Sequence, residues 1–340
     1  MLEKPDLPDE VLIACLQHDY GLQIAQANFL PLGNDRNTAV YRVVDADARP
    51  YFLKLRSGNF DEITVTILRL LSDQGMTQII APIPTRTGQL WARMEAFAVI
   101  LSPFIAGRNG FEVEVSDRQR IKIGAALKGL HTAKVPEALR QRLPRESFSP
   151  YWRDLVREYQ ARAEDSAFAE PVAAQLTALL RAKRTVIDDL VLRAEQLAAH
   201  LQTRALEFVV CHADIHGGNL LIDSDGALFI IDWDTLILAP KERDLMFIGS
   251  GIDNIWPSAR EQAWFYQGYG ATQIDSNALV YYRFERIVED IVAYCEQLLL
   301  SDQGGEDRAE GLRQISGQFE PGNVIEVAFA TDTLSGSPER

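Results

Sequence analysis

The stretch CHADIHGGNLLIDSDGALFIIDWD (211–234) carries the strongest structural signals of the sequence. Its apolar runs LLID (220–223) and FIID (229–232) flank Ser224-Asp225-Gly226, and an Asp-Gly pair between apolar runs is a strong hairpin signal. The preceding LEFVV (206–210) has the composition of one more short strand. The sequence therefore predicts a small β element set between segments of helical character.

Polar residues bracket this hairpin at a fixed spacing. Asp214 follows His212 in the pattern H-x-D-x-x-x-x-N, which ends at Asn219, and Asp232 closes the second apolar run. This is the spacing of a kinase catalytic loop with its metal-binding aspartate. Phosphoryl transfer needs a carboxylate that orients the attacking hydroxyl and accepts its proton, so we predict Asp214 as the catalytic base. Amide and carboxylate oxygens suit Mg²⁺, so Asn219 and Asp232 are the predicted metal ligands.

Two neighbours of the motif have simpler interpretations. His212 is predicted to be a buried structural donor that fixes the loop, whereas His216, inside the loop, receives no firm role. Trp233 is predicted to pack, and the adjacent Arg243 and Asp244 are predicted to form a buried pair with each other.

Upstream of this region the chain alternates between strands and one helix. Strand character marks 29–44, 51–58, 79–84 and 89–105, and an apolar helical face begins near Asp61. The segment SPFIAGRNG (102–110) then has the Pro and Gly content of a connector.

Beyond the connector the pattern becomes helical. Ser116 with Gln119 is a capping-box pattern, and further helices fit 150–163, 171–182 and 184–203. We predict an α+β, two-lobed, protein-kinase-like fold. Residues 1–103 would form a β-rich nucleotide-binding lobe and 104–340 a mainly helical catalytic and substrate-binding lobe.

The N-terminal segment supplies candidates for ATP binding. Lys54 sits mid-strand among apolar residues, where a kinase places the lysine that holds the phosphates, with a helix glutamate as its partner. Without the catalytic-loop motif, a lysine on an edge strand would be the simpler interpretation. Glu62 is the predicted partner, and the backbone near Ser102 and Phe104 is predicted to meet adenine. The turn GNDRNT (33–38) takes the place of a phosphate-covering loop, in which Asn37 and Thr38 are the predicted phosphate contacts.

Composition narrows the partners. Lys and Arg total 34 against 48 Asp and Glu, a formal charge of −14, which disfavours nucleic acid and anionic membrane and favours a small cationic acceptor. Three scattered cysteines argue against a disulfide framework or a zinc site and favour a reducing compartment. With no signal-peptide pattern and no bilayer-length apolar run, we expect a cytoplasmic protein. The oligomeric state is left open.

At these motifs the chain resembles the aminoglycoside phosphotransferase family. The resemblance rests on CHADIHGGNLLI, IIDWD, YFLKL and DEITVTILRLL. More narrowly it is similar to spectinomycin phosphotransferases through LAPKERDLMFIG, YYRFERIVEDI and NVIEVAFAT. The resemblance implies a kinase-like fold and ATP- and Mg²⁺-dependent phosphorylation of a hydroxyl on an aminocyclitol or related sugar, which inactivates the antibiotic. Ala213 departs from the Gly usual in the wider family, a change that we expect to be minor.

The acceptor is less well specified than the chemistry. Acids that we predict to meet its ammonium groups are Asp234, Glu285, Glu289 and Asp290, although a helix face salt-bridged to Arg283 and Arg286 explains them equally well. A metabolic kinase acting on a sugar or amino alcohol remains the alternative. A catalytically silent nucleotide-binding protein is a third hypothesis, opposed by the complete set of motif residues. A protein kinase is disfavoured because no D-F-G or A-P-E segment follows Asp232.

Overall fold

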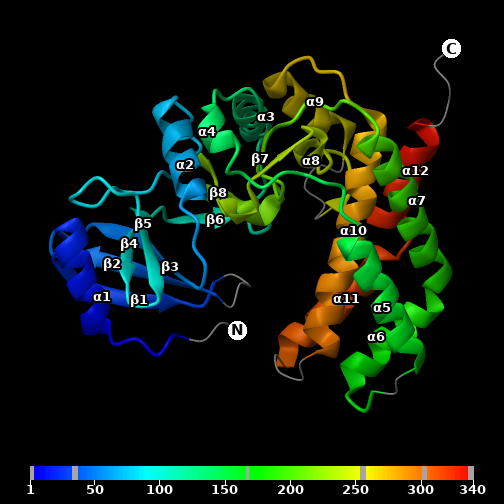
Figure 1. Cartoon of the computed structure of the whole chain (residues 1–340), viewed down its shortest axis with the longest axis horizontal. Helices are drawn as coiled ribbons and strands as arrows, with labels where there is room; N and C mark the ends of the chain where they lie inside the picture. Colours follow the sequence, from blue (N-terminus) through cyan, green and yellow to red (C-terminus); the bar gives the residue numbers. More distant parts are fainter. Residues whose placement is uncertain (1–3, 33–36, 166–167, 253–257, 301–304, 336–340) are drawn as a thin grey trace. The chain divides into compact units, whose positions relative to one another are not determined.

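The computed structural model in Figure 1 describes residues 4–32, 37–165, 168–252, 258–300 and 305–335. The chain separates into two compact units. Unit one comprises Met1–Val115, Ala133–Leu143 and Gly217–Leu236, and unit two comprises Ser116–Thr132, Pro144–His216 and Ile237–Arg340. Unit one thus takes residues from both sides of position 103, and the predicted boundary between functional lobes stays a prediction.

Unit one is built on an antiparallel sheet with the strand order β1-β2-β3-β5-β4. In β3, Leu53 and Leu55 are fully buried in the core, so the alternation of a strand places Lys54 and Arg56 on the other face. This register presents two cations side by side. The strands of the sheet are β1 (Ile24–Leu30), β2 (Thr38–Asp45), β3 (Pro50–Ser57), β4 (Ala92–Met94) and β5 (Phe97–Pro103).

The predicted hairpin is confirmed in a second sheet of unit one, with the order β6-β8-β9. Leu220 pairs with Ile230 and Ile222 with Leu228. Its strands are β6 (Gly107–Asn109), β8 (Leu220–Asp223) and β9 (Leu228–Ile230). Short turns η2 (Gly217–Asn219) and η3 (Trp233–Thr235) precede and follow the hairpin.

The helices of unit one are short. They are α1 (Asp9–Cys15), which continues as a π-helical turn over Leu16–Tyr20, α2 (Ile63–Asp73) and α4 (Glu137–Arg140). The strand expected at 79–84 is wrong, since there the structure has only an isolated bridge from Ile79 to Ile230. Pro82 and Pro84 lack the N–H that a ladder requires.

Unit two is mainly helical, as predicted, around the long buried helix α10, which packs against α5, α7, α11 and α12 (Figure 1). The predicted capping box at Ser116 is present in α3. The helices are α3 (Asp117–His131), α5 (Tyr151–Asp165), α6 (Pro171–Ala182), α7 (Arg184–Gln202), α8 (Glu242–Leu245), α9 (Ala259–Tyr269), α10 (Ser276–Leu299), α11 (Gly305–Gln318) and α12 (Val324–Ser335).

A two-stranded ladder completes unit two. β7 (Val209–Cys211) pairs with β10 (Ile237–Ala239), so the strand predicted at 206–210 begins later than expected. This ladder brings the loop after β7 close to α8. Among the described residues, none of the helices is both long and apolar enough to cross a bilayer.

Candidate active site

Asp214 lies on the loop that follows β7 in unit two, and both of its carboxylate oxygens have partners. Arg286 on α10 places Nη1 2.7 Å from Oδ1, and His216 places Nε2 3.4 Å from Oδ2. The Asp214 and Arg286 side chains are only 21% and 18% exposed. Burial alone would raise the pKa of the Asp214 carboxyl, but the His216 hydrogen bond and the charge of Arg286 hold that pKa well below its usual range. Asp214 is therefore an ionised carboxylate at neutral pH, suited to orient a hydroxyl.

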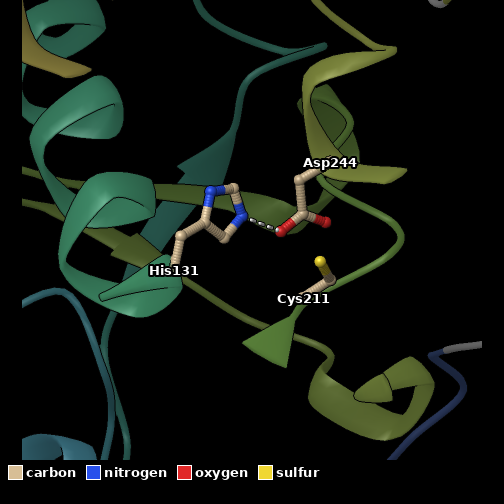
Figure 2. Close-up of side chains that lie close together, drawn as sticks. All are labelled: His131, Cys211 and Asp244. Atoms are coloured by element: carbon tan, nitrogen blue, oxygen red, sulfur yellow. Dashed lines mark hydrogen bonds and ion pairs between the residues drawn. The ribbon is translucent and has the colours of Figure 1, made fainter. Parts of the chain in front are cut away.

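The backbone of this loop is anchored by Asp244 of α8, which is fully buried. The Asp244 carboxylate accepts the N–H of His212 at 3.0 Å and the N–H of Ala213 at 2.6 Å. Its Oδ2 also lies 2.9 Å from His131 Nε2, the contact drawn in Figure 2. Burial would raise the pKa of Asp244, but the hydrogen bond with His131 and the nearby histidines lower it. Asp244 thus pairs with His131 and the loop, and the predicted pairing with Arg243 is wrong.

His212 is buried in the loop as predicted, but its Nδ1 accepts a hydrogen bond where a donor was predicted. Its side chain is fully buried, and Nδ1 accepts the N–H of Asp214 at 3.2 Å. The histidine therefore fixes the backbone of the residue that we assign as base, as an acceptor at that nitrogen and not as a donor.

Ala213 adopts a left-handed backbone conformation with φ 69°. A residue with a Cβ atom pays roughly 1 to 2 kcal/mol for this conformation, which glycine adopts freely. The position therefore favours glycine on conformational grounds, and Ala213 adopts the same conformation at this cost.

Cys211, His131 and Asp244 gather closely enough to hold a metal ion, as Figure 2 shows. Their donor atoms are already used: His131 Nδ1 lies 2.7 Å from the Tyr269 hydroxyl, and the Cys211 thiol lies 3.7 Å from the Ala239 carbonyl. Burial raises the pKa of Cys211 well above its usual value, so the thiol stays protonated. The described contacts give these three side chains a structural role as a hydrogen-bond network that supports the loop.

The two predicted metal ligands lie in unit one, at the two ends of the hairpin. Asn219 is buried and its carbonyl accepts the N–H of Ile231 at 3.0 Å, which ties the loop to the strand that leads to Asp232. Gly110 supports the same loop, because its N–H donates to the Gly217 carbonyl at 2.8 Å and a Cβ there would lie 2.9 Å from that oxygen.

Asp232 is exposed and adopts the left-handed conformation φ 59°, ψ 68°. Such a backbone costs about 1 to 3 kcal/mol in a residue other than glycine and is concentrated at functional sites. The Asp232 carboxylate and the Asn219 amide offer the hard oxygen donors that Mg²⁺ prefers, so the residues present fit this ion.

Lys54 and Arg56 both contact Asp234 in unit one. Asp234 Oδ2 lies 2.5 Å from Lys54 Nζ and 2.8 Å from an Arg56 guanidinium nitrogen. Glu62 has other partners: its carboxylate accepts the Trp91 indole N–H at 3.0 Å and lies 3.6 Å from Arg142. The expected pairing of Lys54 with Glu62 is thus replaced by a pairing with Asp234, and phosphate binding by Lys54 and Glu62 stays a prediction.

The remaining nucleotide candidates lie on strands or next to them. The Asn37 carbonyl accepts the Ser57 N–H at 2.9 Å, and Thr38 begins β2 opposite Arg56. The rest of that predicted phosphate turn, 33–36, lies outside the described residues. Ser102 pairs with Phe52, and the Phe104 N–H contacts the Pro50 carbonyl at 3.4 Å. Their contact with nucleotide stays a prediction.

The acids proposed for the acceptor are all paired with cations. Besides Asp234, these are Glu285 with Arg153 at 2.5 Å, Glu289 with Arg243 at 3.8 Å and Asp290 with Arg286 at 2.9 Å. Arg283, expected as a partner of this face, instead donates to the carbonyls of Met246 and Ile248. The acids thus have internal partners, among which Arg286 also reaches Asp214 and Arg283 does not take part, and their contact with an acceptor stays a prediction.

Comparison with known proteins identifies the family of the chain. The model of the phosphotransferase enzyme family, to which aminoglycoside phosphotransferases belong, matches residues 28–276. The crystal structure of spectinomycin phosphotransferase APH(9)-Ia in complex with ADP and spectinomycin is 38% identical, with a TM-score of 0.89 over 97% of this chain and 99% of that chain.

More distant relatives match less of the chain or share less of its sequence. Protein StrN of Streptomyces griseus is 27% identical over 223 residues, 64% of this chain and 67% of its own length. Amicoumacin kinase hAmiN, crystallised with AMP-PNP, Ca²⁺ and its ligand, shares the fold at 17% identity and a TM-score of 0.61, over 92% of this chain and 93% of that chain. The family match and the 38% identity together show that the chain belongs to the phosphotransferase enzyme family of aminoglycoside phosphotransferases, and that it is a phosphotransferase acting on hydroxyl groups.

Proposed function

We propose that this phosphotransferase transfers the terminal phosphoryl group of ATP to a hydroxyl group of spectinomycin or a close aminocyclitol relative, as an antibiotic-resistance kinase. The observation that supports this acceptor is the 38% identity over 97% of the chain to a phosphotransferase crystallised with ADP and spectinomycin. A second structure of that relative holds AMP, which supports an adenine nucleotide as the donor.

Asp214 is the proposed base. Its ionised carboxylate would accept a hydrogen bond from the acceptor hydroxyl and take its proton as the new O–P bond forms and the bond between the γ-phosphorus and the bridging oxygen of ATP breaks. Because the pKa of Asp214 is held low, it is a weak base. Orientation of the hydroxyl is therefore its larger contribution, with the proton moving late in the transfer.

The donor side rests on oxygen ligands and cations of unit one. Asn219 and Asp232 would hold Mg²⁺, which when bound neutralises phosphate charge. Lys54 would bind phosphate oxygens, and to do so it would give up its ion pair with Asp234. The residues Glu62, Asn37, Thr38, Ser102 and Phe104 are the other proposed contributors to the nucleotide site.

One observation favours the alternative of a metabolic alcohol as acceptor. Glu285, Glu289, Asp290 and Asp234 all have internal cation partners, so they offer no unpaired acid to an ammonium group. A neutral sugar would not need to break these pairs. The acidic net charge alone does not distinguish the two classes.

ADP release by the purified protein with Mg²⁺–ATP tests the proposal against spectinomycin, several aminoglycosides and a panel of sugars and amino alcohols. We expect turnover with spectinomycin and its loss by a factor of at least about 100 in Asp214→Asn, with nucleotide affinity retained. Asp225→Asn, an exposed acid in the hairpin turn, is the matched control and should keep full activity. Turnover confined to another acceptor would refute the antibiotic while leaving the phosphotransferase in place, and full activity of Asp214→Asn would refute the base.

A further inference from the structure

Unit two contains a cavity of about 470 Å³ whose lining includes none of the residues proposed for phosphoryl transfer. Four segments form its walls: the last turn of α3, residues 204–209 up to the start of β7, Lys241 after β10, and the end of α9 with the loop that leads to α10. We propose that this cavity, the α3 pocket, is a second ligand site that binds a small molecule through a phosphate or carboxylate group.

Some charged side chains in the wall of the pocket are committed to ion pairs within the protein, and others are not. Arg204 pairs with Asp275 at 2.6 Å, and the same Asp275 carboxylate accepts the N–H groups that begin α10. Lys241 pairs at 2.9 Å with Glu242, whose side chain is buried behind the wall. These cations and acids satisfy one another, so they give the pocket little charge for a ligand to neutralise.

Lys128 is the exception. Its ammonium lies 5.3 Å from the centre of the Tyr269 ring, and within the described part of the chain it has no carboxylate at ion-pair distance. Glu207 also lines the pocket, but this residue is exposed whereas Lys128 is half-buried, so water and salt weaken the charge of Glu207 more than that of Lys128. Lys128 is therefore the lining charge best placed to hold an anion, and Thr272 and Gln273 add a hydroxyl and an amide that suit an oxyanion.

Hydrogen bonds connect the lining of the pocket to the loop that carries Asp214. Tyr269 and His131 line the pocket, and the Tyr269 hydroxyl lies 2.7 Å from His131 Nδ1. His131 in turn contacts Asp244, which holds the backbone of His212 and Ala213. A ligand bound against Lys128 and Tyr269 adds contacts to one end of this network, so its binding should stabilise the folded unit.

Thermal unfolding of the full chain tests the site. Sodium phosphate and sodium succinate are the two probes, each compared with sodium chloride at matched ionic strength and in the presence of saturating ADP and Mg²⁺, which occupy the nucleotide site. We expect at least one probe to raise Tm by roughly 3 °C beyond the chloride control, and which probe does so separates a phosphate from a carboxylate ligand.

Variants locate the effect. Lys128→Met should lose more than half of the shift, whereas Lys122→Met, on the same helix but outside the pocket lining, should keep it. Equal shifts with chloride, or a full shift in Lys128→Met, would overturn the proposal. A shift lost in Lys54→Met but kept in Lys128→Met would assign the anion to the nucleotide residues and overturn it equally. If Lys128→Met fails to fold, line broadening of inorganic phosphate in ³¹P NMR, compared between the wild type and Lys128→Gln, decides the question.

Discussion

The contact between Asp214 and Arg286 makes a double-mutant cycle the sharpest test of how the catalytic loop is held. The variants are Asp214→Asn, Arg286→Met and the double substitution. Asp214→Asn leaves the partly buried Arg286 with Asp290 as its remaining acid, and Arg286→Met leaves Asp214 with His216, whereas the double change removes both members of the pair. We therefore expect the double variant to be more stable than the sum of the two single effects predicts.

The magnitude follows from distance and exposure. The pair is 2.7 Å apart and its side chains are 21% and 18% exposed, which places it between a surface ion pair and a buried one. Surface pairs contribute about 0.2 to 1 kcal/mol, and breaking a buried pair costs about 3 to 5 kcal/mol. An intermediate coupling of about 2 kcal/mol corresponds to roughly a 30-fold change in the unfolding constant.

Urea unfolding of the four proteins at neutral pH measures the coupling, and a second set at about pH 5 tests whether Asp214 is still ionised there. A carboxyl whose pKa is lowered by folding stabilises the protein above its unfolded pKa, and this stabilisation disappears as pH falls through the lower folded value. Because His216 and Arg286 hold the pKa of Asp214 well below its usual range, the coupling should be the same at both pH values. A coupling below about 0.5 kcal/mol would refute the reasoning, since it would equal that of an exposed pair.

Three further predictions concern the backbone and the metal site. Gly124→Ala should destabilise unit two by about 2 kcal/mol in urea unfolding, because the new Cβ would overlap the Phe265 carbonyl oxygen and lie 2.7 Å from the Tyr269 nitrogen. Its control, Gly317→Ala on α11, meets open space and should gain up to about 1 kcal/mol, so equal effects would contradict the packing argument. Ala213→Gly should stabilise the protein by up to about 1 kcal/mol, because it relieves the strain of the left-handed conformation by more than it adds entropy to the unfolded chain. A lower Tm would count against this prediction. Asp232→Ala should raise the Mg²⁺ concentration needed for half-maximal ATP turnover by at least about 100-fold, because a metal ligand is lost. An unchanged Mg²⁺ titration would exclude a ligand role.

Features that depend on neighbouring residues are predicted well from the sequence. The hairpin after Asn219 follows from Asp-Gly between apolar runs, and the helices at 150–163, 171–182 and 184–203 follow from apolar periodicity. The motif spacing likewise identifies Asp214, Asn219 and Asp232 as candidates, because a catalytic loop and its hairpin are local in the chain. The strand expected at 79–84 does not form, because its apolar content does not compensate for the missing N–H groups of Pro82 and Pro84.

The partners of the charged residues are the part that local pattern does not predict. Arg286 is separated from Asp214 by the β8–β9 hairpin, β10, α8, α9 and the first part of α10, and nothing in the spacing says that it reaches the loop. The predicted pairing of Asp244 with Arg243 fails because adjacent side chains on a helix do not face each other. That geometric rule implies a distant partner for Asp244, but His131 becomes identifiable as this partner only when α3 and α8 are seen together.

The pairing of the predicted acceptor acids changes what the net charge of −14 implies about the substrate. Charge acts on an approaching cation at long range, within a Debye length of about 8 Å, whether or not the acids are internally paired. Direct contact between an ammonium group and one of these acids is a different matter, because each acid is already paired with an arginine that the ammonium group would have to displace. The pairs are Glu285 with Arg153, Glu289 with Arg243 and Asp290 with Arg286. The acidic composition therefore supports attraction of a cationic acceptor but not its recognition by these side chains. Under the proposed role of Asp214 as base, selectivity among alcohols would come from the fit of the reacting hydroxyl to this carboxylate, which Arg286 contacts directly and whose loop Asp244 anchors.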